Sequence, residues 1–157
     1  MGIDPKDRIL EIGCGVGFGV EAIHPLITTG KITAIDRSQT AIARAARRNE
    51  GAVKQGKAEF QATDLLFISK PYRGFDKVFC FNINFFWTKS SLIRECDVIK
   101  SVMARQGTLH IFYGPVFRKE FAKIVDTVTK NLQDERFIVS ETLYNNMLKC
   151  YYIGSKL

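Results

Sequence analysis

The chain has 157 residues, 46% of them hydrophobic, which is the size of one domain with an ordinary core. No segment reaches the roughly 18 consecutive apolar residues that a membrane helix needs, and residues 1–8 are too polar for a signal peptide. We therefore expect a cytoplasmic protein with no membrane partner. The net charge of +7 allows a nucleic-acid partner, but Arg44, Arg47 and Arg48 cluster without interleaved aromatic residues, which favours a solvated basic surface.

The cysteines at positions 14, 80, 96 and 150 are candidates for a zinc or disulfide site. They show no Cys-x-x-Cys spacing and lie in apolar segments, so we interpret them as reduced core thiols. The loops after the fourth and fifth expected strands hold no convergent carboxylates for a hard cation such as Mg²⁺. The sequence therefore predicts no metal site.

Apolar segments of strand length and of helix length alternate along the chain, which predicts an α/β fold with a largely parallel sheet. We expect seven strands, at residues 8–12, 31–36, 58–62, 75–81, 108–113, 137–143 and 148–153. The last two follow each other around Tyr144, Asn145 and Asn146, as in a β-hairpin. Parallel neighbours need long crossovers, so this pair must include an antiparallel strand.

The helices expected between these strands have recognisable ends. Pro25 should end or kink the first helix. The second begins after Ser38, a favourable N-cap residue, and should run to about Gln55 with Gly56 as its stop. Pro115 suits the first turn of the last helix. The apolar positions that mark the first, third and fourth helices are Val20, Ile23, Leu26 and Ile27; Leu92, Cys96, Ile99 and Met103; and Phe117, Phe121, Ile124, Val128 and Leu132.

The clearest local signal is the segment Glu11-Ile12-Gly13-Cys14-Gly15-Val16-Gly17, directly after the first strand. Glycines leave backbone without side chains, so the chain can turn sharply and a ligand can approach main-chain amides. The following helix presents its positive N-terminal end to that ligand. Asp36 ends the second strand 19 residues after Gly17, where a carboxylate can accept both ribose hydroxyls. Together these features predict an adenosine-type ligand.

The glycine spacing separates the two ligand classes that use such a loop. A dinucleotide fingerprint reads G-x-G-x-x-G, and its third glycine would have to stand where this chain has Phe18 or, counted from Gly15, Val20. The Glu-x-Gly-x-Gly-x-Gly pattern instead resembles the first motif of class I S-adenosylmethionine-dependent methyltransferases. Residues 36–38, 62–65 and 74–78 resemble later motifs of that family, and the likeness covers nearly the whole chain. Within the family it is most similar to small bacterial methyltransferases that act on small molecules.

This resemblance implies a Rossmann-like α/β fold with a seven-stranded, mostly parallel sheet, a terminal antiparallel strand and helices on both faces, in a single domain at residues 1–157. It implies S-adenosyl-L-methionine as cofactor and S-adenosyl-L-homocysteine as product. The residues implied to bind it are Glu11, Gly13, Cys14, Gly15 and Gly17 around the methionine part, Asp36 and Arg37 at the ribose, Asp64 and Leu65 at the adenine, and Asn82 at the methionine amino end. Alternatives stay open. Glu11 could cap loop amides without touching ligand, Asp36 could cap the next helix, Asp64 could be an ordinary loop residue, and the Cys14 thiol is interpreted as a space filler.

The catalytic residues are not identified by the sequence, but acceptor candidates should follow the fourth and fifth strands. Residues 82–87 concentrate amides and aromatic rings, which can shield a sulfonium, and Asn84 is the candidate there. The aromatic residues could equally be core. Tyr113 and Tyr144 could orient or deprotonate an acceptor, or lie at the edge of the core. His110, inside a strand, is interpreted as a buried histidine.

Methyl transfer needs little more than a nucleophile in line with the methyl group, so positioning can supply most of the effect. We expect in-line transfer to a small-molecule acceptor. The alternatives are a nucleic-acid or protein methyltransferase, which the charge favours but residues 82–85 do not match, and a non-catalytic S-adenosylmethionine-binding domain; an NAD-dependent oxidoreductase is disfavoured by the glycine spacing. Only residues 1–7 precede the first strand, where relatives carry a helical lid segment. An open pocket, a truncated chain, a homodimer or a large acceptor would each account for this.

Overall fold

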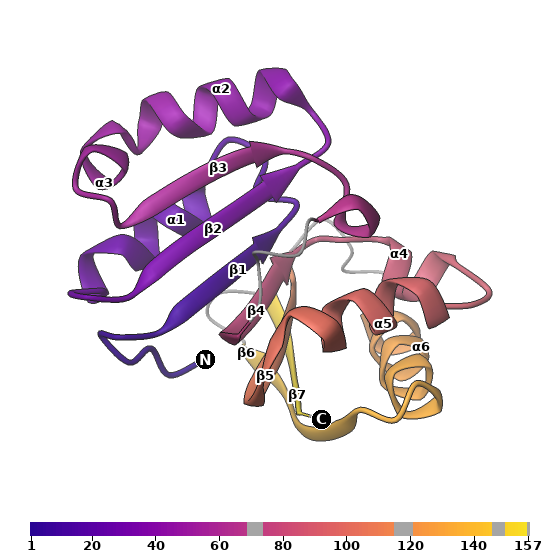
Figure 1. Cartoon of the computed structure of the whole chain (residues 1–157). Helices are drawn as coiled ribbons and strands as arrows, with labels where there is room; N and C mark the ends of the chain where they lie inside the picture. Colours follow the sequence, from indigo (N-terminus) through magenta and orange to yellow (C-terminus); the bar gives the residue numbers. More distant parts are fainter. Residues whose placement is uncertain (69–73, 115–120, 146–149, 157) are drawn as a thin grey trace.

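One seven-stranded sheet organises the molecule (Figure 1). The structure, a computed structural model, describes residues 1–68, 74–114, 121–145 and 150–156. The strands are β1 (Arg8–Ile12), β2 (Lys31–Asp36), β3 (Ala58–Ala62), β4 (Phe75–Phe81), β5 (Met103–Tyr113), β6 (Ile138–Asn145) and β7 (Cys150–Lys156). Their order is β3-β2-β1-β4-β5-β7-β6, with β7 antiparallel to both of its neighbours and every other pair parallel. The predicted Rossmann-like, mostly parallel sheet with an antiparallel C-terminal strand is confirmed.

The helices cover the sheet on both faces, as expected. They are α1 (Phe18–Ile23), α2 (Gln39–Arg48), α3 (Glu50–Lys54), α4 (Phe85–Thr88), α5 (Ile93–Val102) and α6 (Phe121–Asp134), with 3₁₀ turns η1 (His24–Leu26) and η2 (Leu65–Phe67). Successive side chains of a strand point to opposite faces. Ile9 of β1 packs in a core cluster with residues of α1, α2 and α3, whereas Leu10 packs with residues of α4, α5 and α6. Figure 1 shows these two groups of helices well apart. None of the helices in the described ranges is long and apolar enough to cross a membrane.

Several local signals have the predicted effect. The α-helix α1 ends at Ile23, two residues before Pro25. Ser38 is the N-cap of α2, and its hydroxyl accepts a hydrogen bond from the Ala41 amide at 3.2 Å. Gly56 follows α3 with a φ of +71°, in the left-handed region that favours glycine. The side chains of Cys14, Cys80 and Cys96 are buried in the core, as interpreted from the sequence.

The prediction of one long second helix is wrong, because the helix is interrupted at Asn49. This residue has φ −105° and ψ +27°, and it separates α2 from α3. Its buried amide nitrogen donates to the carbonyl oxygens of Gly17, at 3.0 Å, and Ala45, at 2.9 Å. Side-chain hydrogen bonds of this kind compete with the helical ladder, and here they tie the helix to the glycine loop.

Three further expectations at element ends are corrected, and two others lie outside the described residues. Leu26, expected to mark the first helix, is 54% exposed on the 3₁₀ turn η1. Met103 begins β5, pairing with Phe75, and does not end α5; the strand is therefore longer than expected. Tyr144 was expected in the turn of the hairpin but lies within β6, where it pairs with Tyr151. The helix start at Pro115 and Phe117, and the turn at Asn146, fall outside the described residues.

Candidate functional site

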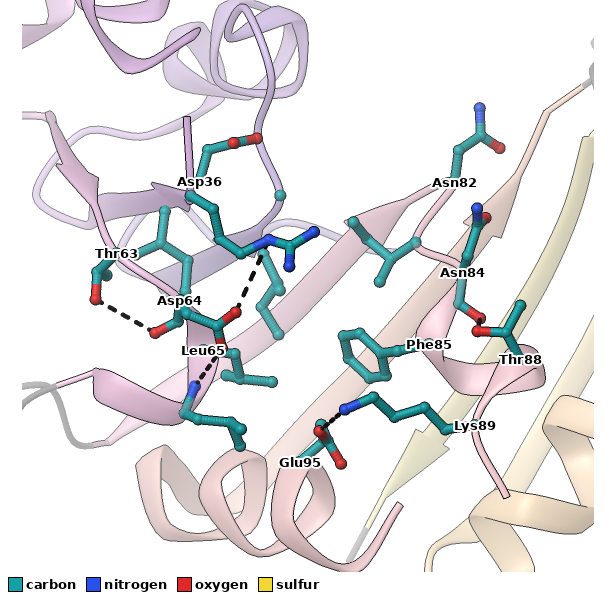
Figure 2. A pocket seen from close by; sticks show the side chains of 16 residues that line it. Asp36, Thr63, Asp64, Leu65, Asn82, Asn84, Phe85, Thr88, Lys89 and Glu95 are labelled. Carbon is teal, nitrogen blue, oxygen red and sulfur yellow. Dashed lines mark hydrogen bonds and ion pairs between the residues drawn. The ribbon is translucent and has the colours of Figure 1, made fainter. Parts of the chain in front are cut away.

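A cleft of about 490 Å³ lies at the carboxyl ends of the parallel strands (Figure 2). It is lined by Gly13 after β1, Asp36 at the end of β2, Asp64 after β3 and Asn82 after β4. This edge is where ligands bind in open parallel sheets, and the volume lies in the range of about 300–1,000 Å³ that small-molecule sites occupy. The fold therefore gathers the sequence-predicted residues of four separate loops into one cavity.

The glycine loop adopts a backbone conformation that other residues rarely take. Gly13, Gly15 and Gly17 have φ values of +70°, +53° and +83°. A Cβ atom at Gly13 would lie 2.3 Å from Ile83, and one at Gly17 would lie 2.7 Å from the Asn49 amide nitrogen. No atom lies within 4 Å of the corresponding position at Gly15. The loop is thus closely packed on both sides and open in its middle.

Glu11 lies beneath this loop and does not line the cleft. Its side chain is buried, and a Cβ atom at Gly19 would lie only 2.2 Å from its Oε1. Burial raises the pKa of Glu11 to about 8; the backbone hydrogen bond from Val20 opposes this, and the charge of Asp36 adds to it. The carboxyl group fills the space under the first turn of α1, which agrees with a buttressing role without ligand contact. Cys14 and Gly17 likewise stand outside the cleft lining.

Asp36 is held in place by two backbone amides. One carboxylate oxygen, Oδ2, accepts from Gly15 at 2.9 Å, and Oδ1 accepts from Ser38 at 2.8 Å. Since Ser38 itself is the N-cap of α2, Asp36 is not needed for that purpose. The carboxylate therefore stands between the glycine loop and α2 with one face toward the cleft.

The wall after β3 is built around Asp64. Its Oδ1 accepts from the Leu66 amide at 2.9 Å and caps η2, while Oδ2 lies 3.8 Å from Nε of Arg37. The Arg37 side chain is largely exposed, so this ion pair is weak and leaves Oδ2 available to a ligand. Leu65 is buried and supplies an apolar surface beside it.

The opposite wall follows β4. Asn82 has a φ of +58°, and its Oδ1 accepts from the Gly114 amide at 2.7 Å, which joins the ends of β4 and β5. Asn84 precedes α4, and its carbonyl accepts from the Trp87 and Thr88 amides. Phe85 lines the cleft, whereas Phe86 is fully buried in the core. Residues 82–87 thus divide between the two roles that the sequence left open.

Neither tyrosine candidate is found in the cleft lining: Tyr113 lies in the core, and the side chain of Tyr144 is not among those that the structure describes. Tyr113 is fully buried, and its hydroxyl donates to the Ile83 carbonyl at 2.9 Å. Burial raises its pKa above the ordinary value, which disfavours a role as a base. Tyr113 supports the wall and does not line it, a correction to the acceptor-site candidate. Tyr144 lies in β6, and its side chain is outside the described part.

His110 is buried within β5, as interpreted from the sequence. Its Nε2 lies 2.7 Å from the Thr108 hydroxyl. Burial, the N-terminal amino group and Lys77 lower its pKa to about 3. In the described ranges, no three His, Cys, Asp or Glu side chains gather as a metal ion would require.

Sequence reasoning missed Lys89 and Glu95, which both line the cleft. Glu95 is 5% exposed and forms an ion pair with Lys89. A signal was available, because Glu95 follows Leu92 by three residues and so falls on the apolar stripe that Cys96 and Ile99 continue. A carboxylate within such a stripe needs a partner or a function.

Comparison with known proteins decides the family. Residues 9–107, well over half of the chain, match the model of the methyltransferase domain. The chain belongs to the methyltransferase domain family. With the fold described above, this shows a class I S-adenosylmethionine-dependent methyltransferase domain, whose cofactor is S-adenosylmethionine.

The individual relatives show how far this likeness extends. An uncharacterized protein of Synechococcus sp. is 29% identical over 132 residues, which are 83% of this chain but only 31% of that protein. A SAM-dependent methyltransferase from Aquifex aeolicus superposes with a TM-score of 0.76 at 18% identity, covering 98% of this chain and 84% of that one. The [4+2]-cyclase SpnF superposes with a TM-score of 0.74 at 19% identity, covering 94% and 57%. Structural likeness at such identities shows the fold alone.

Proposed function

We propose that this methyltransferase domain transfers the methyl group of S-adenosylmethionine to a small-molecule acceptor held beside residues 82–85. The observation that carries the proposal is the continuity of the cleft, which joins Asp36 and Asp64 to Asn84 and Phe85. A cofactor fixed at the first two side chains would reach toward the last two. Because the chain spans about a third of the Synechococcus relative, the activity of a longer protein is part of this proposal.

The residues present fit the cofactor. Asp36 keeps acceptor positions for ribose hydroxyls beyond its bonds to Gly15 and Ser38. Oδ2 of Asp64 can accept from an adenine amino group, with Leu65 packing beside the ring. No atom lies within 4 Å of a Cβ position at Gly15, so the methionine part of a ligand can approach the backbone there.

Catalysis by this chain would rest on positioning. S-adenosylmethionine supplies a methyl group bound to a positively charged sulfur. Ile83 and Phe85 offer apolar surface that excludes water, and the Asn84 amide is a polar group suited to orienting an acceptor. His110 and Tyr113 are buried outside the cleft lining, so in-line displacement here relies on geometry and an acceptor that is already nucleophilic.

The cofactor half is tested by calorimetric titration with S-adenosylhomocysteine. Asp36→Ala removes the ribose acceptor and the bond to Gly15, so we expect affinity to fall by about 10- to 100-fold. Asp76→Ala is the matched control, because Asp76 also accepts from a backbone amide, that of Arg8 at 2.9 Å, away from the cleft. Equal affinity in the wild type and Asp36→Ala, or binding of NAD in place of the adenosyl ligand, would contradict the proposal.

A polyanionic acceptor such as RNA is the second candidate, and one surface favours it. Arg44, Arg47 and Arg48 line a shallow groove with Val16, beside the glycine loop. Nε of Arg48 donates to the Val16 carbonyl, and its guanidinium lies over the exposed Phe18 ring at 3.9 Å. Methyl transfer from labelled cofactor to RNA, lost in Arg44→Ala/Arg47→Ala and at high salt, would support this candidate over a small molecule.

A cytoplasmic location stays a prediction from the sequence.

A further inference from the structure

One ion pair lies inside the cleft and has no part in the proposed function so far. Glu95 stands on α5 beside Leu92 and Cys96, two residues of the core, and its side chain is only 6% exposed. Its Oε1 accepts from the Lys89 ammonium, which follows α4. Burying a carboxylate among apolar neighbours is costly unless it is paired, so Lys89 offsets much of that cost. Both side chains of the pair also line the cleft.

The position of the pair points to one end of the cleft. Helix α5 packs against η2, the turn that Asp64 caps. Figure 2 shows Glu95 and Lys89 at the far end of the cleft from Asp36, beyond Asp64 and Leu65. A ligand whose ribose lies at Asp36 would therefore direct its base toward Glu95 and Lys89.

The chemistry of the pair fits a base edge that carries a donor beside an acceptor. An ammonium has three donors, of which Glu95 occupies one, and a carboxylate has about four acceptor positions. Adenine presents an amino group with two hydrogens, next to ring nitrogens that accept. Asp64 and Glu95 can each take one of these hydrogens.

We propose that Glu95 accepts a hydrogen bond from the 6-amino group of the cofactor's adenine while Lys89 donates to a neighbouring ring nitrogen. These side chains then determine specificity for an adenosyl ligand. The inference rests on the proposed function, because it assumes that the cofactor occupies this cleft. Hypoxanthine carries a carbonyl where adenine has the amino group, so the Glu95 carboxylate would repel it, and a buried mismatch of this kind is strongly disfavoured.

The test compares the affinities of S-adenosyl-L-homocysteine and S-inosyl-L-homocysteine by calorimetry. In Glu95→Gln the side chain keeps its size, but its amide can donate to the inosine carbonyl. We expect the ratio of the two affinities to fall by about tenfold or more. Glu59→Gln is the matched control, since Glu59 pairs with Lys31 at 2.6 Å outside the cleft. The ratio of the adenosyl and inosyl affinities of Glu59→Gln should equal that of the wild type.

A double variant protects the test against a folding defect. Lys89→Met/Glu95→Gln removes both charges together and leaves no buried ion without a partner. It should also lose discrimination while unfolding cooperatively. If folded Glu95→Gln or the double variant binds S-adenosyl-L-homocysteine with the same adenosyl-to-inosyl affinity ratio as the wild type, the inference is overturned but the proposed function is not. Absence of adenosyl binding in the wild-type protein would instead overturn the proposed function and, with it, this inference.

Discussion

At the scale of single residues, Glu11 carries its carboxyl group where ionisation is disfavoured. The side chain is 3% exposed, and Oε2 has no hydrogen-bond partner among the described residues. Only glycine fits above it, because a Cβ atom at Gly19 would overlap Oε1. The group therefore stabilises the loop best when it is protonated, which explains the raised pKa.

The raised pKa predicts how stability depends on pH. Between the ordinary value of 4.5 and about 8, the folded protein holds a proton on Glu11 that the unfolded chain releases. The stabilising contribution is therefore complete below pH 4.5 and is lost as the pH rises through about 8. Glu11→Gln cannot titrate. We expect the free energy of unfolding of the wild type, relative to this variant, to fall by at least about 1 kcal/mol across that interval.

Urea unfolding at a series of pH values measures this difference. Taking the difference between the two proteins cancels His110 and the other groups that titrate equally in both. A difference that stays constant with pH would show that Glu11 is ionised in the folded state.

At the scale of elements, Asn49 couples α2 to the glycine loop. Its amide donates to Gly17 in the loop and to Ala45 in the helix, and the residue is buried. A Cβ atom at Gly17 would meet this same amide. The break in the predicted helix is therefore the point at which α2 holds the loop in shape.

Asn49→Ala should both destabilise the protein and weaken cofactor binding. Loss of the buried hydrogen bonds should cost about 1–3 kcal/mol in the free energy of unfolding, measured in urea. The affinity for S-adenosylhomocysteine should fall as well, because the Gly17 carbonyl loses its donor. Glu50→Ala is the control: its exposed ion pair with Lys54 should contribute less than about 0.5 kcal/mol. Full stability and affinity in Asn49→Ala would refute the coupling.

Element positions in the first half of the chain could be read from the sequence with little error. β1 and β2 begin and end where apolar runs meet loop residues, because strands buried on both faces are largely apolar. Errors arose where a local pattern has two meanings. Met103 continues the apolar face of α5 in sequence, yet it forms the start of β5, since either element would bury it.

At the scale of the whole molecule, the cleft is assembled from both halves of the chain. Gly13, Asp36 and Asp64 come from the ends of β1, β2 and β3, whereas Asn84 immediately precedes α4 and Glu95 lies in α5. A ligand bound between them requires both halves to be folded.

Cofactor binding should therefore stabilise the whole domain. At a concentration about 100 times its Kd, S-adenosylhomocysteine should raise the free energy of unfolding by about 2.7 kcal/mol and the midpoint of thermal unfolding by roughly 5–10 °C. Thermal unfolding monitored with and without ligand measures the shift. Methionine alone, which lacks the adenosine part, should give little change. A shift confined to part of a biphasic transition would argue against a site shared by both halves.

Features with local causes could be derived from the order of the amino acids alone. Glycine spacing, the carboxylate at Asp36 and the apolar runs of the parallel strands each follow from the chemistry of neighbouring residues, and they suffice for the family and its cofactor. Which side chains share the cleft follows from the three-dimensional packing of the strands. Because β4 lies next to β1 in the sheet, the segment that follows β4 brings Lys89 and Glu95 into one cavity with Asp64, whereas Tyr113 at the end of β5 is buried in the core. Such proximity depends on strand order, which the local pattern does not encode.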